Sequence, residues 1–318
     1  MQGDAVHPRR SSGWCWLGAV CVGVVVLVVV WLYRAPALGL HWMLAAHGLA
    51  DTASPRVGEG AGVAAYCVDI QAHPVQGLQN NLSGLTFNAE TQTLFAIINR
   101  PAAVAELSLD GVLMRHMPLS GVADPEGITH VAGQWFVVAD EASNQVYWLE
   151  IGPGERRAAV HPQPLLPVQL GGIGNLGLEG VSWDQDRGVL VVVQENLPQR
   201  VWVLEGLQPP DGPLPSSAIR AREWAPDGWL ARVTADQSSI TVRSDNGRWL
   251  MLSAASALVV EYTPDGALVG LMPLWRGQHG LQQKVPQAEG IATDDSGRLF
   301  VVSEPNLFYR FKAQALCG

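Results

Sequence analysis

The chain has 318 residues, of which 48% are hydrophobic and 15% are charged, and its net charge at neutral pH is −9. This length and apolar content are sufficient for a sizeable buried core, so they exclude an intrinsically disordered chain. The acidic balance also argues against nucleic acid as a partner.

An apolar stretch without charges, WCWLGAVCVGVVVLVVVWLY, covers residues 14–33. Its length matches the ~20 residues that a helix needs to cross ~30 Å of hydrocarbon, so we predict one transmembrane helix there. Arg9 and Arg10 lie before it. By the positive-inside rule we expect residues 1–13 in the cytoplasm and the rest of the chain beyond the inner (cytoplasmic) membrane, on its periplasmic or extracytoplasmic side. The alternative is a signal peptide cleaved near Ala35-Pro36-Ala37, although its apolar region would be unusually long.

The composition changes twice after this stretch. Residues 34–62, which include DTASPRVGEGAG, are rich in small residues and are predicted to form a linker. Residues 63–318 contain short alternating apolar and polar segments separated by Gly, Asn, Asp and Pro, with no segment of helical periodicity and length. We therefore predict one all-β domain over residues 63–318.

A repeated phrase runs through this domain. Five copies begin at Ser83, Glu126, Glu179, Ser238 and Glu289, so their starts are 43, 53, 59 and 51 residues apart. Each copy contains two strands around a turn, as in EGVSWDQDRGVLVVVQE, and a third strand follows, as in RVWVLEG. A period of ~40–50 residues is typical of the four-stranded blades of β-propellers. The pattern predicts a five-bladed β-propeller of four-stranded blades.

The ends of the repeat array predict how the ring closes. The fifth copy has almost no chain left for its outermost strand, whereas VAAYCVDIQ precedes the first copy as a strand without a blade. We expect this N-terminal strand to complete the last blade. Closure would bring Cys67, in that strand, near Cys317, and an exported location would let the two thiols form a disulfide. Two free thiols are the alternative.

Aligning the copies produces two columns of polar residues. The first column is Ser83, Glu126, Glu179, Ser238 and Glu289, and the second is Asn99, Glu141, Glu195, Ser253 and Glu304. The two members of a copy are 15 or 16 residues apart, with the turn midway, so we expect them to meet as cross-strand neighbours. The inner strand of every blade lines the channel of a propeller, so both columns would lie at one mouth of that channel. The glycine that follows the first column, as in Gly127, Gly180 and Gly290, is expected to allow close packing there.

Six carboxylates at one rim repel one another, and no Lys, Arg or His occupies either column to compensate them. A divalent cation would do so, and Ca²⁺ suits carboxylate and amide oxygens better than Zn²⁺, which prefers Cys and His. We therefore predict a Ca²⁺ site. The candidate ligands are Glu126, Glu141, Glu179, Glu195, Glu289, Glu304 and Asn99. The alternative is that these glutamates accept backbone N–H groups of neighbouring blades and hold no metal.

Three segments resemble the SdiA-regulated, or YjiK-like, family: NLSGLTFNAETQTLFAIINRPAAVAELSLDG, DPEGITHVAGQWFVVADE and QAEGIATDDSGRLFVVSEPNLFYRF. The resemblance extends from Tyr66 to Phe311, and the single membrane anchor also fits that family. It implies a five-bladed propeller related to NHL-repeat proteins that binds Ca²⁺, with the six glutamates in the motif positions, and it implies no particular biochemical activity.

These observations favour a membrane-anchored, exported Ca²⁺-binding propeller that binds a small ligand or a protein at its channel mouth. The alternative is a metal-dependent hydrolase of the lactonase or phosphoesterase type, in which the ion polarises an ester or phosphate oxygen. No nucleophile elbow, phosphate-binding loop or dinucleotide fingerprint is present, so we assign no catalytic residue. Neither the ligand nor the oligomeric state follows from the sequence.

Overall fold

The computed structural model of the chain describes residues 62–79, 81–165, 177–195, 199–210, 219–227 and 234–313. These residues form strands and a single short 3-10 helix, η2 (Val63–Ala65). Within this part of the chain, no helix has the length and apolarity required to cross a membrane. The predicted transmembrane helix at 14–33 lies outside the described residues.

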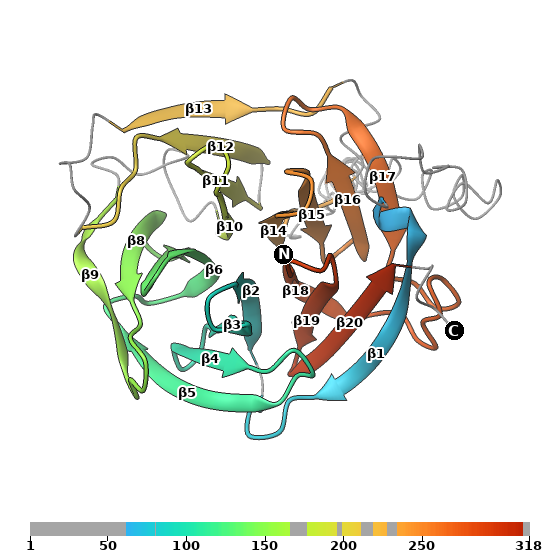
Figure 1. Cartoon of the computed structure of the whole chain (residues 1–318), viewed down its shortest axis with the longest axis horizontal. Coiled ribbons are helices and arrows are strands. Elements are labelled where there is room, and N and C mark those ends of the chain that lie inside the picture. Colours follow the sequence, from blue (N-terminus) through green and yellow to red (C-terminus); the bar gives the residue numbers. More distant parts are fainter. Residues whose placement is uncertain are drawn as a thin grey trace, which may run out of the picture.

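The strands form antiparallel sheets arranged around a central axis (Figure 1). The largest sheet has the order β2-β3-β4-β5-β9-β8-β7-β6. Its two halves meet where β5 and β9 pair in parallel over Leu119↔Ala158 and Ser120↔Ala159. The strands of this sheet are β2 (Leu82–Asn88), β3 (Thr93–Ile98), β4 (Ala103–Leu107), β5 (Leu113–Ser120), β6 (Pro125–Ala132), β7 (Trp135–Asp140), β8 (Gln145–Glu150) and β9 (Ala158–Pro164).

Two further sheets of four strands follow in chain order. One runs β10-β11-β12-β13 and the other β14-β15-β16-β17, and in both each strand pairs with the next. Their bounds are β10 (Leu178–Asp184), β11 (Val189–Gln194), β12 (Arg200–Glu205), β13 (Arg220–Trp224), β14 (Ser239–Val242), β15 (Trp249–Ser253), β16 (Leu258–Tyr262) and β17 (Leu268–Pro273).

The remaining sheet joins the two ends of the described chain. It has the order β1-β20-β19-β18, so β1 (Tyr66–Pro74) is its outer strand, followed by β20 (Leu307–Ala313), β19 (Leu299–Glu304) and β18 (Gln287–Thr293). The N-terminal strand therefore completes the last sheet, as the sequence predicts. Cys67 is disulfide-bonded. Its partner lies outside the described residues, as does Cys317, so the pairing of Cys67 with Cys317 stays a prediction.

The inner strands surround the axis. β2 contacts β6, β6 contacts β10, β10 contacts β14, β14 contacts β18, and β18 contacts β2 again, so the five strands form a closed cycle. Each of them begins a sheet segment whose later strands lie progressively further out (Figure 1). This is the architecture of a β-propeller.

Apolar side chains on both faces of the middle strands form the core between neighbouring sheets. In β11, Val192 packs in one cluster with Val137 of β7, whereas Val191 packs in another with Ile240 and Trp249 of the following sheet. Successive side chains of a strand point to opposite faces, so a continuously apolar strand supplies two interfaces at once. This is why β3, β7 and β11 are buried along their whole length.

Glycines allow the inner strands to approach closely at the end where the two predicted columns lie. A Cβ atom on Gly127 would lie 2.4 Å from the backbone oxygen of Glu179 in the next inner strand. A Cβ on Gly84 would lie 2.5 Å from the backbone oxygen of Glu126. Both distances are too short for any side chain, which confirms the close-packing role predicted for this glycine position.

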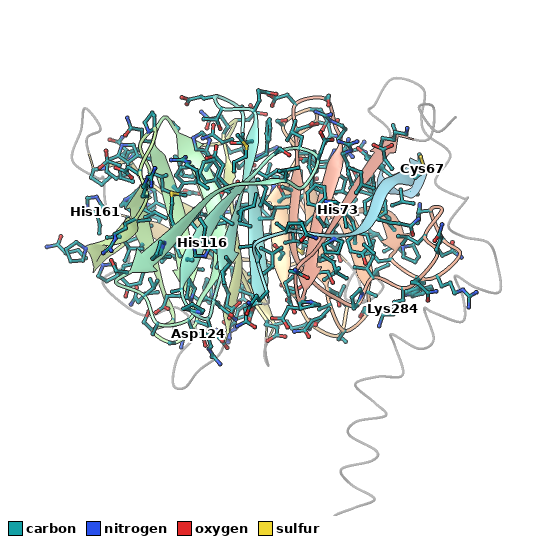
Figure 2. All side chains as sticks on the ribbon, turned by 90° about the horizontal axis from the view of Figure 1, so that it is seen from below. Cys67, His73, His116, Asp124, His161 and Lys284 are labelled. Carbon is teal, nitrogen blue, oxygen red and sulfur yellow. The ribbon has the colours of Figure 1, made fainter. Side chains whose placement is uncertain are left out.

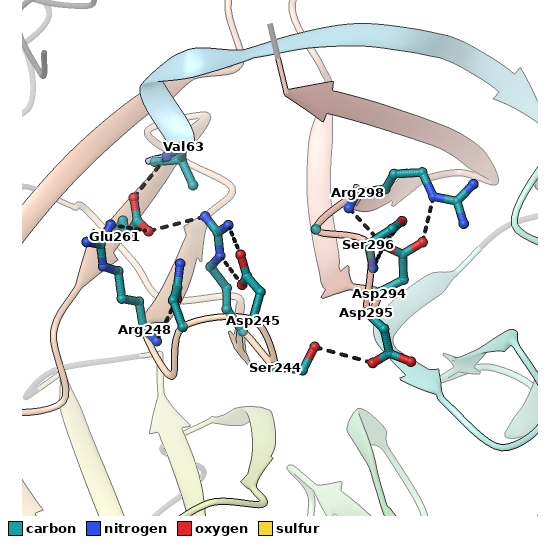
Figure 3. Close-up of polar contacts among 12 residues, drawn as sticks. Val63, Ser244, Asp245, Arg248, Glu261, Asp294, Asp295, Ser296 and Arg298 are labelled. Carbon is teal, nitrogen blue, oxygen red and sulfur yellow. Dashed lines mark hydrogen bonds and ion pairs between the residues drawn. The ribbon is translucent and has the colours of Figure 1, made fainter. Parts of the chain in front are cut away.

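A buried ion-pair network attaches the start of the described chain to the sheet of β14–β17 (Figure 3). Glu261 in β16 is fully buried, and its Oε1 atom accepts from Arg243 at 3.3 Å and from Arg248 at 3.4 Å. Its other oxygen accepts the backbone N–H of Val63 at 2.9 Å. The guanidinium of Arg243 also lies over the ring of Tyr66, the first residue of β1. One carboxylate therefore fixes the segment that leads into the closing strand.

Candidate metal centre

Three first-column glutamates lie in irregular positions of the ladder between an inner strand and its neighbour. Pro125 pairs with Asp140 and Gly127 with Ala139, so no residue lies directly opposite Glu126. The register also shifts around Glu179 and around Glu289. The expected direct cross-strand pairing is therefore wrong in detail. A β-bulge inserts an unpaired residue and re-aims its side chain, and these bulges recur at the same position of the repeat.

Among the described residues, the side chains of Asp124, Glu126 and Glu141 form a close group. Each can offer a carboxylate oxygen within 4.8 Å of those of the other two. Asp124 lies just before β6, Glu126 is the second residue of β6, and Glu141 follows β7. Figure 2 labels Asp124 at one face of the propeller, with Cys67 toward the opposite face. We call this group the acidic cluster.

Backbone hydrogen bonds fix the positions of the cluster. The N–H of Glu141 donates to the carbonyl oxygen of Asp124 at 2.9 Å. The N–H of Asp124 donates in turn to the carboxylate of Asp140 at 2.7 Å. Asp140 is 2% exposed and ends β7, so it connects the loop before β6 to the neighbouring strand. The three acids are therefore held close together by the ladder and its caps.

Uncharged side chains of the first copy of the repeat donate hydrogen bonds to both carboxylate oxygens of Glu126. The hydroxyl of Ser83 in β2 donates to one of its oxygens at 2.7 Å, and the amide of Asn99 donates to the other at 2.9 Å. The side-chain oxygens Oδ1 of Asn99 and Oδ1 of Asp124 are buried, and neither has a hydrogen-bond partner within the described part of the chain. Buried oxygens normally have a partner, so each of these atoms is a candidate ligand for a cation.

The donor set of the cluster fits a metal ion. It consists of three carboxylates, with no Cys or His, and hard oxygen ligands of this kind suit Ca²⁺, Mg²⁺ or Mn²⁺. Coordination of a cation by the cluster would satisfy Oδ1 of Asp124, which lacks a hydrogen-bond partner among the described residues.

Burial and mutual repulsion disfavour the charged forms of these glutamates. The pKa of Glu126 is raised to about 7, chiefly by burial; the hydrogen bonds from Asn99 and Ser83 lower it, and the charges of Asp124 and Glu141 raise it. The pKa of Glu141 is also raised, first by burial and then by Asp124, while Arg100 lowers it. A bound cation would stabilise the charged forms of these carboxyls and oppose both effects.

Glutamates from other copies converge on the same region. The pKa of Glu289 is raised to about 8, chiefly by burial; a hydrogen bond with Gln287 lowers it, and the charges of Glu304 and Glu126 raise it. Burial also raises the pKa of Glu179 well above its usual range, and the neighbours that add to this effect are Glu126, Glu195, Glu141 and Glu289. Glu126 in β6 thus raises the pKa of glutamates in β10 and β18, which indicates that these inner strands bring their carboxylates toward the same mouth of the channel.

The candidate residues from the sequence divide into two groups. Glu126, Glu141 and Asn99 belong to the acidic cluster or contact it. Glu179, Glu195, Glu289 and Glu304 interact electrostatically across the mouth without joining that tight group.

Two acids at the mouth are absent from the predicted columns. They are Asp124, and Asp236, whose charge raises the pKa of Glu289. Both lie two residues before the first column, in the triplets DPE and DQS. A third column at this position, composed of Asn81, Asp124, Gly177, Asp236 and Gln287, would have indicated them.

Comparison with known families matches residues 59–312 to the family described as SdiA-regulated. Among solved structures, a luciferin-regenerating enzyme is 12% identical with a TM-score of 0.48, over 76% of this chain and 95% of that one. A gluconolactonase from Xanthomonas campestris is 18% identical with a TM-score of 0.43, over 73% and 86% of the two chains. Virginiamycin B lyase from Staphylococcus aureus is 14% identical with a TM-score of 0.40, over 75% and 68%. Since the family match covers most of the sequence, the chain belongs to the SdiA-regulated family.

Proposed function

We propose that this protein is a membrane-anchored, exported β-propeller that binds Ca²⁺ at one mouth of its channel and presents the ion-bearing face to a small ligand or a protein. The observation that carries the proposal is the acidic cluster, in which the carboxylates of Asp124, Glu126 and Glu141 lie close together and Oδ1 of Asp124 is buried with no hydrogen-bond partner among the described residues. Such an arrangement is costly unless a cation compensates it.

Calcium is the ion that this donor set favours. Ca²⁺ takes 6–8 oxygens in flexible geometry, whereas Mg²⁺ requires near-ideal octahedral coordination and keeps several waters. Asp124, Glu126 and Glu141 would hold the ion through carboxylate oxygens, and Asn99 would do so through Oδ1. Ser83 would keep Glu126 oriented through its hydrogen bond. When bound, the ion would supply a positive charge that attracts an oxygen atom of a ligand.

The proposal includes a five-bladed ring. It is supported by the closed cycle of five inner strands and by the short parallel contact, two residue pairs long, that joins the halves of the eight-stranded sheet. Counting those halves as two blades makes every blade four-stranded. Blades of a propeller are normally separate sheets, and two such pairs add little to the contact between neighbours.

Calcium titration of the full-length chain in detergent tests the ion site. After dialysis against EDTA, calorimetry should detect Ca²⁺ binding by the wild type and by Glu150→Gln, an exposed acid at the end of β8. Asp124→Asn should weaken binding by at least about tenfold because it removes one of three converging charges. No binding heat for the wild type, or equal affinities for Asp124→Asn and Glu150→Gln, would overturn the proposal.

The membrane placement has its own test. In a bacterial host, the full-length chain should remain in the membrane fraction after alkaline extraction. Protease added to the outer side of the inner membrane should digest the propeller while the N-terminal residues stay protected. Release into the soluble fraction, or protection of the propeller, would contradict it.

Metal-dependent hydrolysis is the second candidate, favoured by Glu289. Its pKa, raised by burial to about 8, gives it the basicity of a general base near neutral pH, and it lies at the same mouth as the cluster. Turnover of a panel of lactones and phosphate esters that requires Ca²⁺ and is lost in Glu289→Gln would establish this function. Absence of turnover across the panel would leave binding as the function.

A further inference from the structure

Arg100 is a cation placed directly against the acidic cluster. It follows Asn99 in the chain, and its Nη2 atom donates to Oδ2 of Asp124 in an ion pair. The backbone around it is held because the Asn81 amide donates to the Arg100 carbonyl oxygen at 2.7 Å. The arginine side chain is 70% exposed, whereas that of Asp124 is only 10% exposed. The guanidinium therefore reaches the cluster from the solvent side.

The charge of Arg100 acts on the whole cluster and not only on Asp124. Glu126 and Glu141 also interact with it electrostatically. It therefore interacts with the same three carboxylates that would hold the metal ion.

The ion pair leaves part of the cluster open. Arg100 engages Oδ2 of Asp124, while Oδ1 of the same carboxylate is buried and has no hydrogen-bond partner within the described part of the chain. Oδ1 of Asn99 is likewise buried and has no hydrogen-bond partner among these residues. A cation that coordinates Oδ1 of Asp124 would therefore not have to displace Arg100 from Oδ2. Arg100 and the bound ion would then both be positively charged, would repel each other, and would both interact with the same three carboxylates.

We infer that Arg100 is an internal counter-cation that sets both the affinity of the acidic cluster for metal ions and its preference among ions of different charge. The inference rests on the proposed cation site and adds a residue that tunes it. With Arg100 present, the cluster is partly neutralised before any ion binds, so binding is weakened. The weakening grows with the charge of the ion, because the repulsion between two charges is proportional to each of them.

Two variants separate charge from shape. Arg100→Gln removes the positive charge but keeps a side chain that can donate to Asp124, and Arg100→Lys keeps the charge and loses the planar fork. Removing a unit charge beside a divalent ion should raise Ca²⁺ affinity by about tenfold. For trivalent Tb³⁺ the same change should raise affinity by about 30-fold, since the repulsion is half as large again. Arg100→Lys should stay close to the wild type for both ions.

The experiment measures Ca²⁺ and Tb³⁺ binding by calorimetry for the full-length wild type and both variants. The first measurements are made at low salt. At high salt, the gain in ion affinity of Arg100→Gln should be smaller, because the guanidinium of Arg100 is exposed and its charge is screened. A wild type that binds ions while Arg100→Gln binds them equally or more weakly would overturn this inference and leave the ion site intact. An equal gain for both ions, or the same gain in Arg100→Lys, would also overturn it. A wild type that binds neither ion would overturn the proposed function together with this inference.

Discussion

Ser83 donates its hydroxyl to the carboxylate of Glu126 over 2.7 Å, from the inner strand β2 to the inner strand β6. Ser83 is the first-column residue of its own copy, and Asn99, which donates to the other oxygen of Glu126, is the second-column residue of that copy. A glutamate at either position would face Glu126 with a like charge and no proton to donate. The first copy, which has no glutamate in either column, thus supplies the hydrogen-bond donors to Glu126 of the next copy.

The fourth copy follows a similar rule. Its first-column residue, Ser238, lies just before β14 and donates to the carbonyl oxygen of Ala288 in β18 at 3.0 Å. Its second-column residue, Ser253, donates to Asp236. The two serine-containing copies therefore differ from the others because they connect neighbouring strands through neutral hydroxyls, which limits the number of charges at the mouth.

The raised pKa values predict how stability depends on pH. Glu126 and Glu289 have pKa values of about 7 and about 8, above the ordinary value of 4.5, so the folded protein binds more protons than the unfolded chain in this window. The contribution of such groups to stability is fully present below pH 4.5 and is lost as pH rises through the folded pKa values. Metal-free protein should therefore unfold at a lower temperature at about pH 9 than at about pH 5.5.

Calcium should reverse this trend. At about pH 9 the carboxylates are charged and bind the ion without releasing protons, whereas at about pH 5.5 binding must displace protons and weakens. Calorimetric melting with EDTA and with Ca²⁺ at both pH values checks the prediction. The control is Glu126→Gln with Glu289→Gln, in which the pH dependence of the metal-free protein should flatten. An apo protein that gains stability above neutral pH would contradict it.

The fold could be predicted because each copy of the repeat contains strands of alternating apolar and polar residues, separated by residues typical of turns. The copies beginning at Glu126, Glu179 and Glu289 retain both signals, and VAAYCVDIQ fitted no copy, which indicated the closing strand β1. The parallel contact between β5 and β9 could not be predicted in this way. It depends on how two outer strands approach after the ring has formed, and the apolar pattern within a strand carries no information about that.

The candidate site could be predicted only in part. The spacing of the glutamates placed them at one mouth, but side-chain direction depends on the bulges beside Glu126, Glu179 and Glu289, and a bulge follows from strand register rather than from composition. Asp124 was missed because the alignment began two residues after it. Arg100 was missed because its charge acts on the cluster of the next copy, through an ion pair that sequence spacing does not reveal.

The buried network around Glu261 predicts a local opening at the start of the closing strand. Glu261→Gln would remove a carboxylate partner of Arg243, which is 2% exposed, and it would replace the carboxylate that accepts the Val63 N–H by a neutral amide. Breaking a buried pair by removing one partner costs about 3 kcal/mol or more. Urea denaturation should show this loss, and hydrogen exchange of the Val63 amide should accelerate.

Glu106 provides the matched control for Glu261. It occupies the corresponding place in β4, is 6% exposed, and pairs with Arg115 while accepting from Thr93 at 2.8 Å. Glu106→Gln should also destabilise the protein, but it should leave exchange at Val63 unchanged until global unfolding. Equal acceleration at Val63 in both variants would show that Glu261 has no special role in fixing the N-terminal segment.

Replacing Gly127 by alanine should destabilise the ring more than the same change at Gly188. A Cβ on Gly127 meets the backbone oxygen of Glu179 at 2.4 Å, which neither strand can avoid without moving. Gly188 has φ of +63° with nothing within 4 Å, so alanine there costs about 1 kcal/mol of backbone strain alone. Because the clash also separates β6 from β10, Gly127→Ala should weaken Ca²⁺ binding, whereas Gly188→Ala should not. Denaturation and calcium titration of both variants measure the difference.

The disulfide of Cys67 predicts that reducing agents weaken the closure of the ring. If the partner is Cys317, peptide mapping without reduction should recover a cross-linked pair from β1 and the C-terminal residues, and Cys317→Ser should abolish it. Such a bond would close a loop of roughly 250 residues and contribute roughly 2–5 kcal/mol. Cys67→Ser and Cys317→Ser should then destabilise equally, and the double variant should lose no more than either alone, because both single changes remove the same bond. A double variant that loses the sum of the two would instead assign Cys67 to a different cysteine.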